Sequence, residues 1–172
     1  MVTRSTFVAV AAAAALAALS TAAAAASAPR VSVDSINALS IPARPYDENA
    51  DADRAVDAAL ARAAHSHKLV LIDLGGNWCA DCLILAGVMD LPEVSAFVDA
   101  HYEVVTVDVG RFNKNLQIPA RYGITTRLEG VPSVLVVKPD GTLVDRGHIS
   151  ALADARSMTP QGIADWLASW AR

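Results

Sequence analysis

Apolar residues recur with two different spacings along residues 47–172, and each spacing predicts a kind of secondary structure. Intervals of three and four residues, as at Val56, Ala59 and Ala63, are typical of one face of a helix. Short continuous apolar runs are typical of strands that are buried on both faces. Helices are expected from Asp47, over 79–89, over 92–100, near 116–122 and over 160–170, and strands over 68–74, 102–109 and 133–137.

A turn signal at Pro139-Asp140-Gly141 follows the third strand, so residues 142–145 are expected to return as the second strand of an antiparallel hairpin. Strands that are joined through helices are expected to run parallel to one another. The element order therefore predicts an α/β fold in which a mixed central sheet carries helices on both faces.

The first residues of the chain have a different composition, rich in alanine. Arg4 precedes an apolar stretch over 7–19, and Ala24-Ala25-Ala26 offers a cleavage site, which together are typical of a secretory signal peptide. Residues 1–26 are expected to be removed and the protein to reach the periplasm. An uncleaved membrane anchor is the alternative, although the strongly apolar part is shorter than the ~20 residues that span a bilayer.

The rest of the chain suits one soluble domain. Residues 27–46 contain three prolines and little periodicity, so they are expected to form an extended arm before a domain over 47–172. Without Arg4, the 14 basic residues become 13 against 18 acidic ones, a formal charge of −5. This charge gives no basic surface for nucleic acid, and no nucleic-acid partner is expected.

Cys79 and Cys82 are the only cysteines, and they stand three residues apart after a predicted strand. Such a pair in this context is typical of a thiol–disulfide redox motif. A structural disulfide is the alternative, but so short a loop would constrain little of the unfolded chain. A cysteine at the start of a helix faces free N–H groups that favour the thiolate, so Cys79 is expected to attack and Cys82 to lie buried.

Asp73 stands six residues before the first cysteine, Trp78 stands directly before it, and Val131-Pro132 leads into the third strand. Together with the cysteines, these positions give residues 47–172 a resemblance to the thioredoxin superfamily. Residues 76–82 and Asp108-Val109-Gly110 extend this resemblance to its exported, reductase-type members. The resemblance implies a thioredoxin fold and an enzyme that exchanges a Cys79–Cys82 disulfide with client proteins, without a dissociable cofactor. An upstream redox partner and clients with disulfides or thiols are the expected partners.

The resemblance also implies roles for these residues. Asp73 would lie beneath the cysteines and carry the proton of the buried thiol, unless it faces solvent or caps the next loop. Trp78, Val131 and Pro132 would bind the substrate, with Val131 offering its backbone beside a cis-proline. The ordinary trans form of Pro132 is the alternative.

The two residues between the cysteines, Ala80 and Asp81, are expected to tune the redox potential. A carboxylate there would disfavour the Cys79 thiolate and make the protein more reducing. A reductase is therefore the first expectation for the direction of exchange, and a disulfide isomerase or oxidase the second.

Metal-based functions are less well supported by the sequence. Zinc would need two further ligands, and a c-type haem would need histidine where Leu83 follows the second cysteine. A non-enzymatic copper-binding module is the alternative from another class. No metal site is predicted, and His65 and His67 are expected to lie at a solvated helix end.

Four basic residues are expected either to be solvated or to border the partner-docking face: Arg111, Lys114, Arg121 and Arg127.

Overall fold

The computed structural model describes residues 26–171, and its centre is a three-stranded sheet of order β2-β1-β3. The strands are β1 (Leu69–Gly75), β2 (Tyr102–Asp108) and β3 (Ser133–Val137). Strand β1 pairs in parallel with β2 and antiparallel with β3. The signal peptide expected over 1–26 lies outside the described residues, except for its last residue. Among residues 26–171, no helix is long and apolar enough to cross a membrane.

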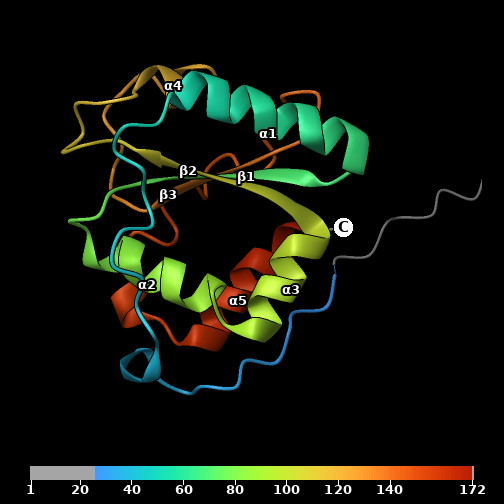
Figure 1. Cartoon of the computed structure of the whole chain (residues 1–172), viewed down its shortest axis with the longest axis vertical. Coiled ribbons are helices and arrows are strands. Elements are labelled where there is room, and N and C mark those ends of the chain that lie inside the picture. Colours follow the sequence, from blue (N-terminus) through green and yellow to red (C-terminus); the bar gives the residue numbers. More distant parts are fainter. Residues whose placement is uncertain (1–25, 172) are drawn as a thin grey trace, which may run out of the picture.

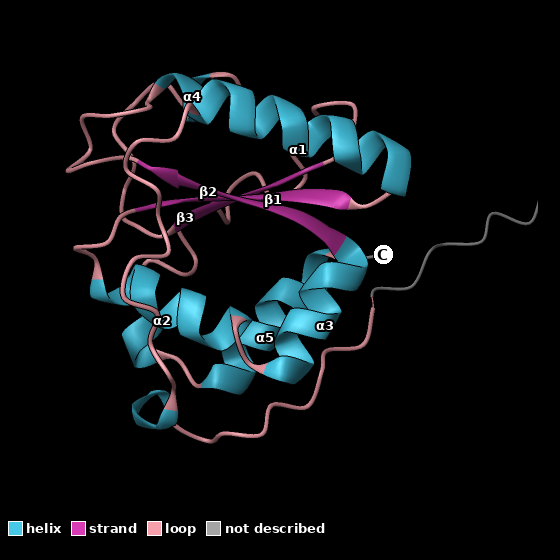
Figure 2. Cartoon of the chain, viewed as in Figure 1, coloured by secondary structure: helices cyan, strands magenta, loops and turns pink. Residues whose placement is uncertain are grey.

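Helices cover both faces of the sheet (Figures 1 and 2), which confirms the predicted layers. Helices α1 and α4 lie on one face, and α2, α3 and α5 lie on the other. The extended arm follows the outside of the α2 layer and includes one short turn of 3₁₀ helix. The helices are α1 (Ala52–Ser66), α2 (Ala80–Met89), α3 (Pro92–His101), α4 (Gln117–Ala120) and α5 (Pro160–Trp170), with 3₁₀ turns at Ile36–Ala38 and Ala155–Ser157.

The alternation of side chains along β1 divides the core in two. Val70 and Ile72 belong to the cluster that includes α1, whereas Leu71 belongs to the cluster of α2, α3 and α5. Because alternate residues of a strand face the same side, Asp73 faces the layer of α2. The continuous apolar run of this strand is therefore explained by burial on both faces, and its one charged residue is directed toward the helix that follows the cysteines.

Two details of the fold differ from the expectation. Helix α1 begins after Asp51, not at Asp47, because the Asp51 side chain accepts a hydrogen bond from the Arg54 N–H, while Asp47 instead accepts one from Asn49. Strand β3 runs antiparallel to β1 although it follows a helix. Of the 24 residues between β2 and β3, only the four of α4 are helical, so this connection has no crossover helix of the length needed to return along the ~23 Å of β2.

The predicted strand over 142–145 is also wrong, since only one isolated bridge joins Val137 to Leu143. The backbone does turn back here, and the Val144 N–H donates to the carbonyl of Val136. The N–H of Val136, however, donates to the carboxylate of Asp145 at 3.0 Å. A side chain thus replaces the backbone group that would have continued the ladder.

Candidate active site

The two cysteines form a disulfide at the start of α2, where Cys79 is the N-cap residue. The Cys79 sulfur accepts a hydrogen bond from the N–H of Cys82 at 3.1 Å. Cys79 keeps 5% of its surface exposed and borders an open groove, whereas Cys82 is fully buried. A sulfur in this position faces the unpaired N–H groups and the positive end of the helix dipole, which stabilise a thiolate.

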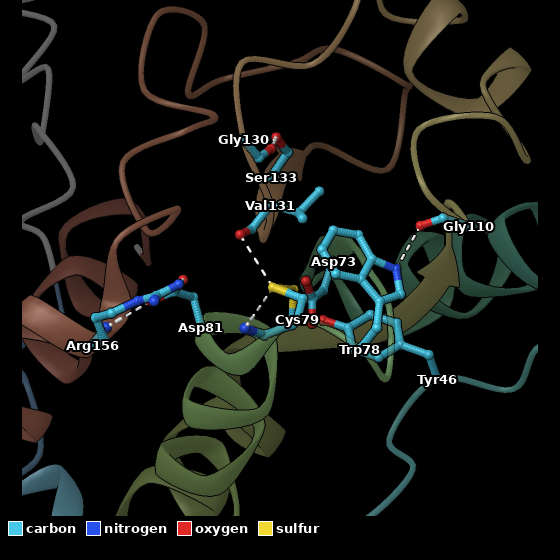
Figure 3. Close-up of a disulfide and its surroundings, with 11 residues drawn as sticks. Tyr46, Asp73, Trp78, Cys79, Asp81, Gly110, Gly130, Val131, Ser133 and Arg156 are labelled. Carbon is cyan, nitrogen blue, oxygen red and sulfur yellow. Dashed lines mark hydrogen bonds and ion pairs between the residues drawn. A yellow bond between two sulfur atoms is a disulfide. The ribbon is translucent and has the colours of Figure 1, made fainter.

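The loop before β3 brings its backbone directly to the disulfide (Figure 3). The peptide bond between Val131 and Pro132 is cis, as expected. The carbonyl oxygen of Val131 lies 3.3 Å from the Cys79 sulfur. The main chain of Val131 is therefore in direct contact with the cysteine that borders the groove.

Asp73 is 1% exposed, so the alternative that it faces solvent is wrong. One carboxylate oxygen, Oδ2, accepts a hydrogen bond from the Tyr46 hydroxyl at 2.7 Å, and the other, Oδ1, has no partner in the described structure. Burial raises the pKa of Asp73 to about 7, and the hydrogen bond from Tyr46 opposes this rise. The carboxyl group can therefore accept or release a proton near neutral pH.

Asp81 has a partner that the sequence did not indicate. Its side chain is buried, and its oxygen Oδ1 accepts a hydrogen bond from the backbone N–H of Arg156 at 2.9 Å and one from the Arg156 guanidinium at 3.0 Å. The guanidinium also forms an ion pair with the other oxygen, Oδ2. Burial opposes ionisation of Asp81, but the contacts with Arg156 outweigh it and hold the pKa of Asp81 below its usual value. The negative charge of Asp81, which was expected to act on Cys79 as an unpaired charge, is thus paired with the positive charge of Arg156.

An aromatic pair forms one wall of the groove beside Cys79. Trp78 is 42% exposed, and its indole N–H donates to the carbonyl of Gly110 at 2.7 Å. Its ring lies edge-on to Phe112, with 6.1 Å between the centroids. Arg111 lies over the Trp78 ring and Arg127 over the Phe112 ring. The groove has a volume of about 490 Å³ and is lined also by Val131 and Arg156.

The four basic residues between β2 and β3 therefore differ from one another. Arg111 and Arg127 border the groove through their aromatic contacts. Lys114 pairs with Asp108, and Arg121 pairs with Asp53 and Asp57 on α1. Only the first two contact aromatic side chains that line the groove.

The histidines are not gathered at the cysteines. His65 and His67 are exposed at the end of α1, as expected, and His67 shares a pocket with His101 at the end of α3. That pocket borders the first residues of β1, whereas the disulfide follows its last residues. Within residues 26–171, no group of three or more His, Cys, Asp or Glu side chains is arranged to hold a metal ion.

The sequence profile of the family described as "Thioredoxin-like" matches residues 51–139. The chain belongs to this family. It is 34% identical over 114 residues to the thiol:disulfide interchange protein DsbD 1 of Pseudomonas aeruginosa, a match that covers 64% of this chain and 18% of that protein. The chain thus spans less than a fifth of this relative.

A solved structure described as a disulphide isomerase from Xylella fastidiosa is 41% identical, with a TM-score of 0.67, and the match covers 72% of this chain and 94% of that one. Together with the redox-active cysteine spacing, these relatives identify the chain as a thiol–disulfide oxidoreductase of thioredoxin fold.

The sequence does not predict three residues that the structure places at the site: Tyr46, Phe112 and Arg156. Tyr46 falls within the expected extended arm, and the sequence indicates no role for Phe112 or Arg156. A large aromatic residue at the end of a proline-rich arm, next to the domain, is the one signal that could have indicated Tyr46. Arg156 contacts Asp81 across 75 residues of sequence, and no local pattern indicates such a contact.

Proposed function

We propose that the protein reduces disulfides of client proteins in the cell envelope, with Cys79 as the attacking thiol and Cys82 as the resolving thiol. The Cys79 thiolate attacks a client disulfide, and one client sulfur leaves as a thiolate that takes a proton. The Cys82 thiol then loses its proton to Asp73, and its sulfur attacks Cys79. The second client sulfur leaves and is protonated, so that the client gains two electrons and the Cys79–Cys82 disulfide forms again.

The polar surroundings of the Cys79 sulfur favour reduction over oxidation of clients, and this observation carries the proposal. Within the described residues, its polar contacts are one N–H group, from Cys82, and one carbonyl oxygen, from Val131. The motif places Ala80 and Asp81 between the cysteines, and the nearby Arg156 cation is bound to Asp81. A thiolate that is stabilised by the helix N-terminus but by no unpaired cation in its motif leaves the reduced form less stable, and the protein more reducing, than one with a positive charge there.

A reductase must be reduced again after each turnover, so an upstream dithiol donor is part of the proposal. The alanine-rich residues 1–26 and the relation to a thiol:disulfide interchange protein support a location in the periplasm. For clients, the groove beside Cys79 offers the backbone of Val131, the exposed Trp78 ring and the guanidinium group of Arg156. Tyr, Trp and Arg are the side chains that most often dominate binding at protein interfaces.

Disulfide isomerisation is the second candidate, and the name of the 41% identical Xylella structure favours it. Equilibration with glutathione redox buffers distinguishes the two. A reductase is expected to have a potential nearer to that of thioredoxin, about −270 mV, than to that of the strong oxidant DsbA, about −120 mV. A value above about −180 mV, the level of protein disulfide isomerase, would reject the reductase and favour the isomerase.

A further inference from the structure

Tyr46 is the last residue of the arm, and its side chain is 1% exposed beside the disulfide. Its hydroxyl donates to Asp73 Oδ2 at 2.7 Å. A Cβ atom on Gly75 would lie 2.5 Å from this hydroxyl oxygen and 2.8 Å from the Cys82 sulfur, so both atoms border the same point. The phenol, the carboxylate and the buried sulfur are therefore neighbours, and Gly75 leaves the space in which they meet.

The loop between β1 and α2, residues 76–79, holds Tyr46 in this position. The N–H of Tyr46 donates to Asn77 Oδ1 at 3.1 Å, and Asn77 Nδ2 donates to the Tyr46 carbonyl at 2.9 Å. Asn77 stands two residues before Cys79. From β2, the hydroxyl of Thr106 donates to the carbonyl of Pro45 at 3.1 Å. The arm is thus bound to the same loop that carries the attacking cysteine, which fixes the phenol relative to the disulfide.

The two oxygens of Asp73 have different environments as a result. Oδ2 is occupied by the Tyr46 hydroxyl, and Oδ1 is buried without a partner. A buried polar atom without a hydrogen bond is costly, and a catalytic role is one of the reasons for which such an atom persists. A buried oxygen without a partner, on the carboxylate that neighbours Cys82, is the group that a proton from Cys82 requires.

We infer that Tyr46 is a positioning residue of the exchange reaction, whose hydroxyl holds one oxygen of Asp73 so that the other can take the proton of Cys82. The inference rests on the role proposed above for Asp73. In this step the S–H bond of Cys82 breaks, the proton moves to Asp73, and the Cys82 sulfur attacks the Cys79 sulfur of the mixed disulfide. The client sulfur leaves with the electron pair of the broken bond.

The protonation of Asp73 gives a readout for this role. In the described structure, the titratable groups around it are Tyr46 from the arm, Cys82 from α2, and Asp90 at the end of α2, which lines a cavity of about 340 Å³ together with Asp73. The Tyr46 hydroxyl stabilises the ionised carboxylate, so its loss raises the pKa of Asp73 further above about 7. The pH at which Asp73 can accept a proton then rises.

Tyr46→Phe tests the inference, and Tyr102→Phe is its matched control. Tyr102 is also buried, but its hydroxyl donates to the carbonyl of Leu167 in the other core cluster. Reduced protein is mixed with 5,5′-dithiobis(2-nitrobenzoate) in a stopped-flow instrument between pH 5.5 and 9. The first release of coloured thiolate reports the attack by Cys79, and the second, concentration-independent release reports the attack by Cys82.

Tyr46→Phe is expected to move the pH midpoint of the second release upward by about one unit. This shift corresponds to the loss of one hydrogen bond to the charged carboxylate. Tyr102→Phe leaves the midpoint unchanged, and in an Asp73→Asn background Tyr46→Phe has no further effect. Should Tyr46→Phe fold poorly, Asn77→Ala, which frees the arm, is expected to shift the midpoint in the same direction.

Coincident profiles for wild type and Tyr46→Phe, or an equal shift in Tyr102→Phe, would overturn the inference. A wild type without any second release would instead reject the proposed exchange by Cys82, so the two failures are distinguishable.

Discussion

Replacing Asp73 with asparagine is expected to stabilise the oxidised protein at neutral and alkaline pH, although it removes a residue proposed to act in exchange. Asp73 is 1% exposed, and one of its oxygens has no hydrogen bond. Asparagine has nearly the same shape and keeps an oxygen that can accept the Tyr46 hydroxyl, but it carries no charge. The substitution therefore tests the cost of burying this carboxylate with little change in packing.

The magnitude follows from the pKa of Asp73, which burial raises from 3.8 to about 7. Since the pKa of the folded state is above that of the unfolded state, the group stabilises the fold fully below pH 3.8, and this stability is lost as pH rises to about 7. At 1.36 kcal/mol per unit, the loss reaches about 4 kcal/mol. Asp73→Asn is expected to recover up to this amount at pH 8 and almost none at pH 4.

Unfolding of oxidised wild type and oxidised Asp73→Asn in guanidinium chloride, between pH 4 and 8.5, measures the difference in their free energies of unfolding. The contributions of the other titrating groups are the same in both proteins and cancel in this difference. Asp145→Asn is the matched control, because Asp145 is also buried and burial raises its pKa to about 6. It is expected to gain stability over pH 4–6 and to leave the exchange kinetics unchanged. An equal gain for Asp73→Asn at pH 4 and pH 8 would refute the electrostatic explanation.

Two further predictions concern the cysteines and the pair beside them. Cys82→Ser is expected to accumulate mixed disulfides with clients through Cys79, whereas Cys79→Ser accumulates few; preferential alkylation of Cys82 in the reduced protein at neutral pH would reverse the assignment. Arg156→Gln leaves the Asp81 carboxylate without its partner, so the Cys79 pKa should rise and the potential should become more negative. The pH dependence of alkylation measures the Cys79 pKa, and equilibration with glutathione measures the redox potential. Values equal to those of wild type would show that Asp81 does not act on Cys79.

The secondary structure was largely predictable because its causes are local. Strands β1 and β3 are continuous apolar runs buried on both faces, and their predicted bounds agree with the structure to within one residue. Helix α5 has the predicted bounds, and the Thr159 hydroxyl caps it by accepting a hydrogen bond from the Gly162 N–H. The errors arose where two local solutions compete. Asp47 and Asp51 are both good N-caps, and only the tertiary structure selects between them.

The position of the disulfide was equally accessible, since the cysteine spacing and the cis-proline motif are local signals. The polar contacts that adjust the site were not, because they join distant parts of the chain. The hydroxyl of Tyr46 reaches Asp73 across 27 residues, and Arg156 reaches Asp81 across 75. In both cases the sequence predicts a role for one member of the pair, and no local pattern connects it with the other.

The ion pair with Arg156 changes the effect that Asp81 is expected to have on the redox potential. A lone Asp81 carboxylate near the Cys79 thiolate would repel it by roughly 2 kcal/mol at an effective dielectric of ~20 and a separation of ~7 Å. Bound to Arg156, the same carboxylate belongs to a nearly neutral pair, whose field falls off more steeply with distance. Arg156 is also more than half exposed, so a client that approaches the groove can compete for its guanidinium. A client carboxylate that drew Arg156 away from Asp81 would restore the repulsion on Cys79 and make the bound protein a stronger reductant than the free one.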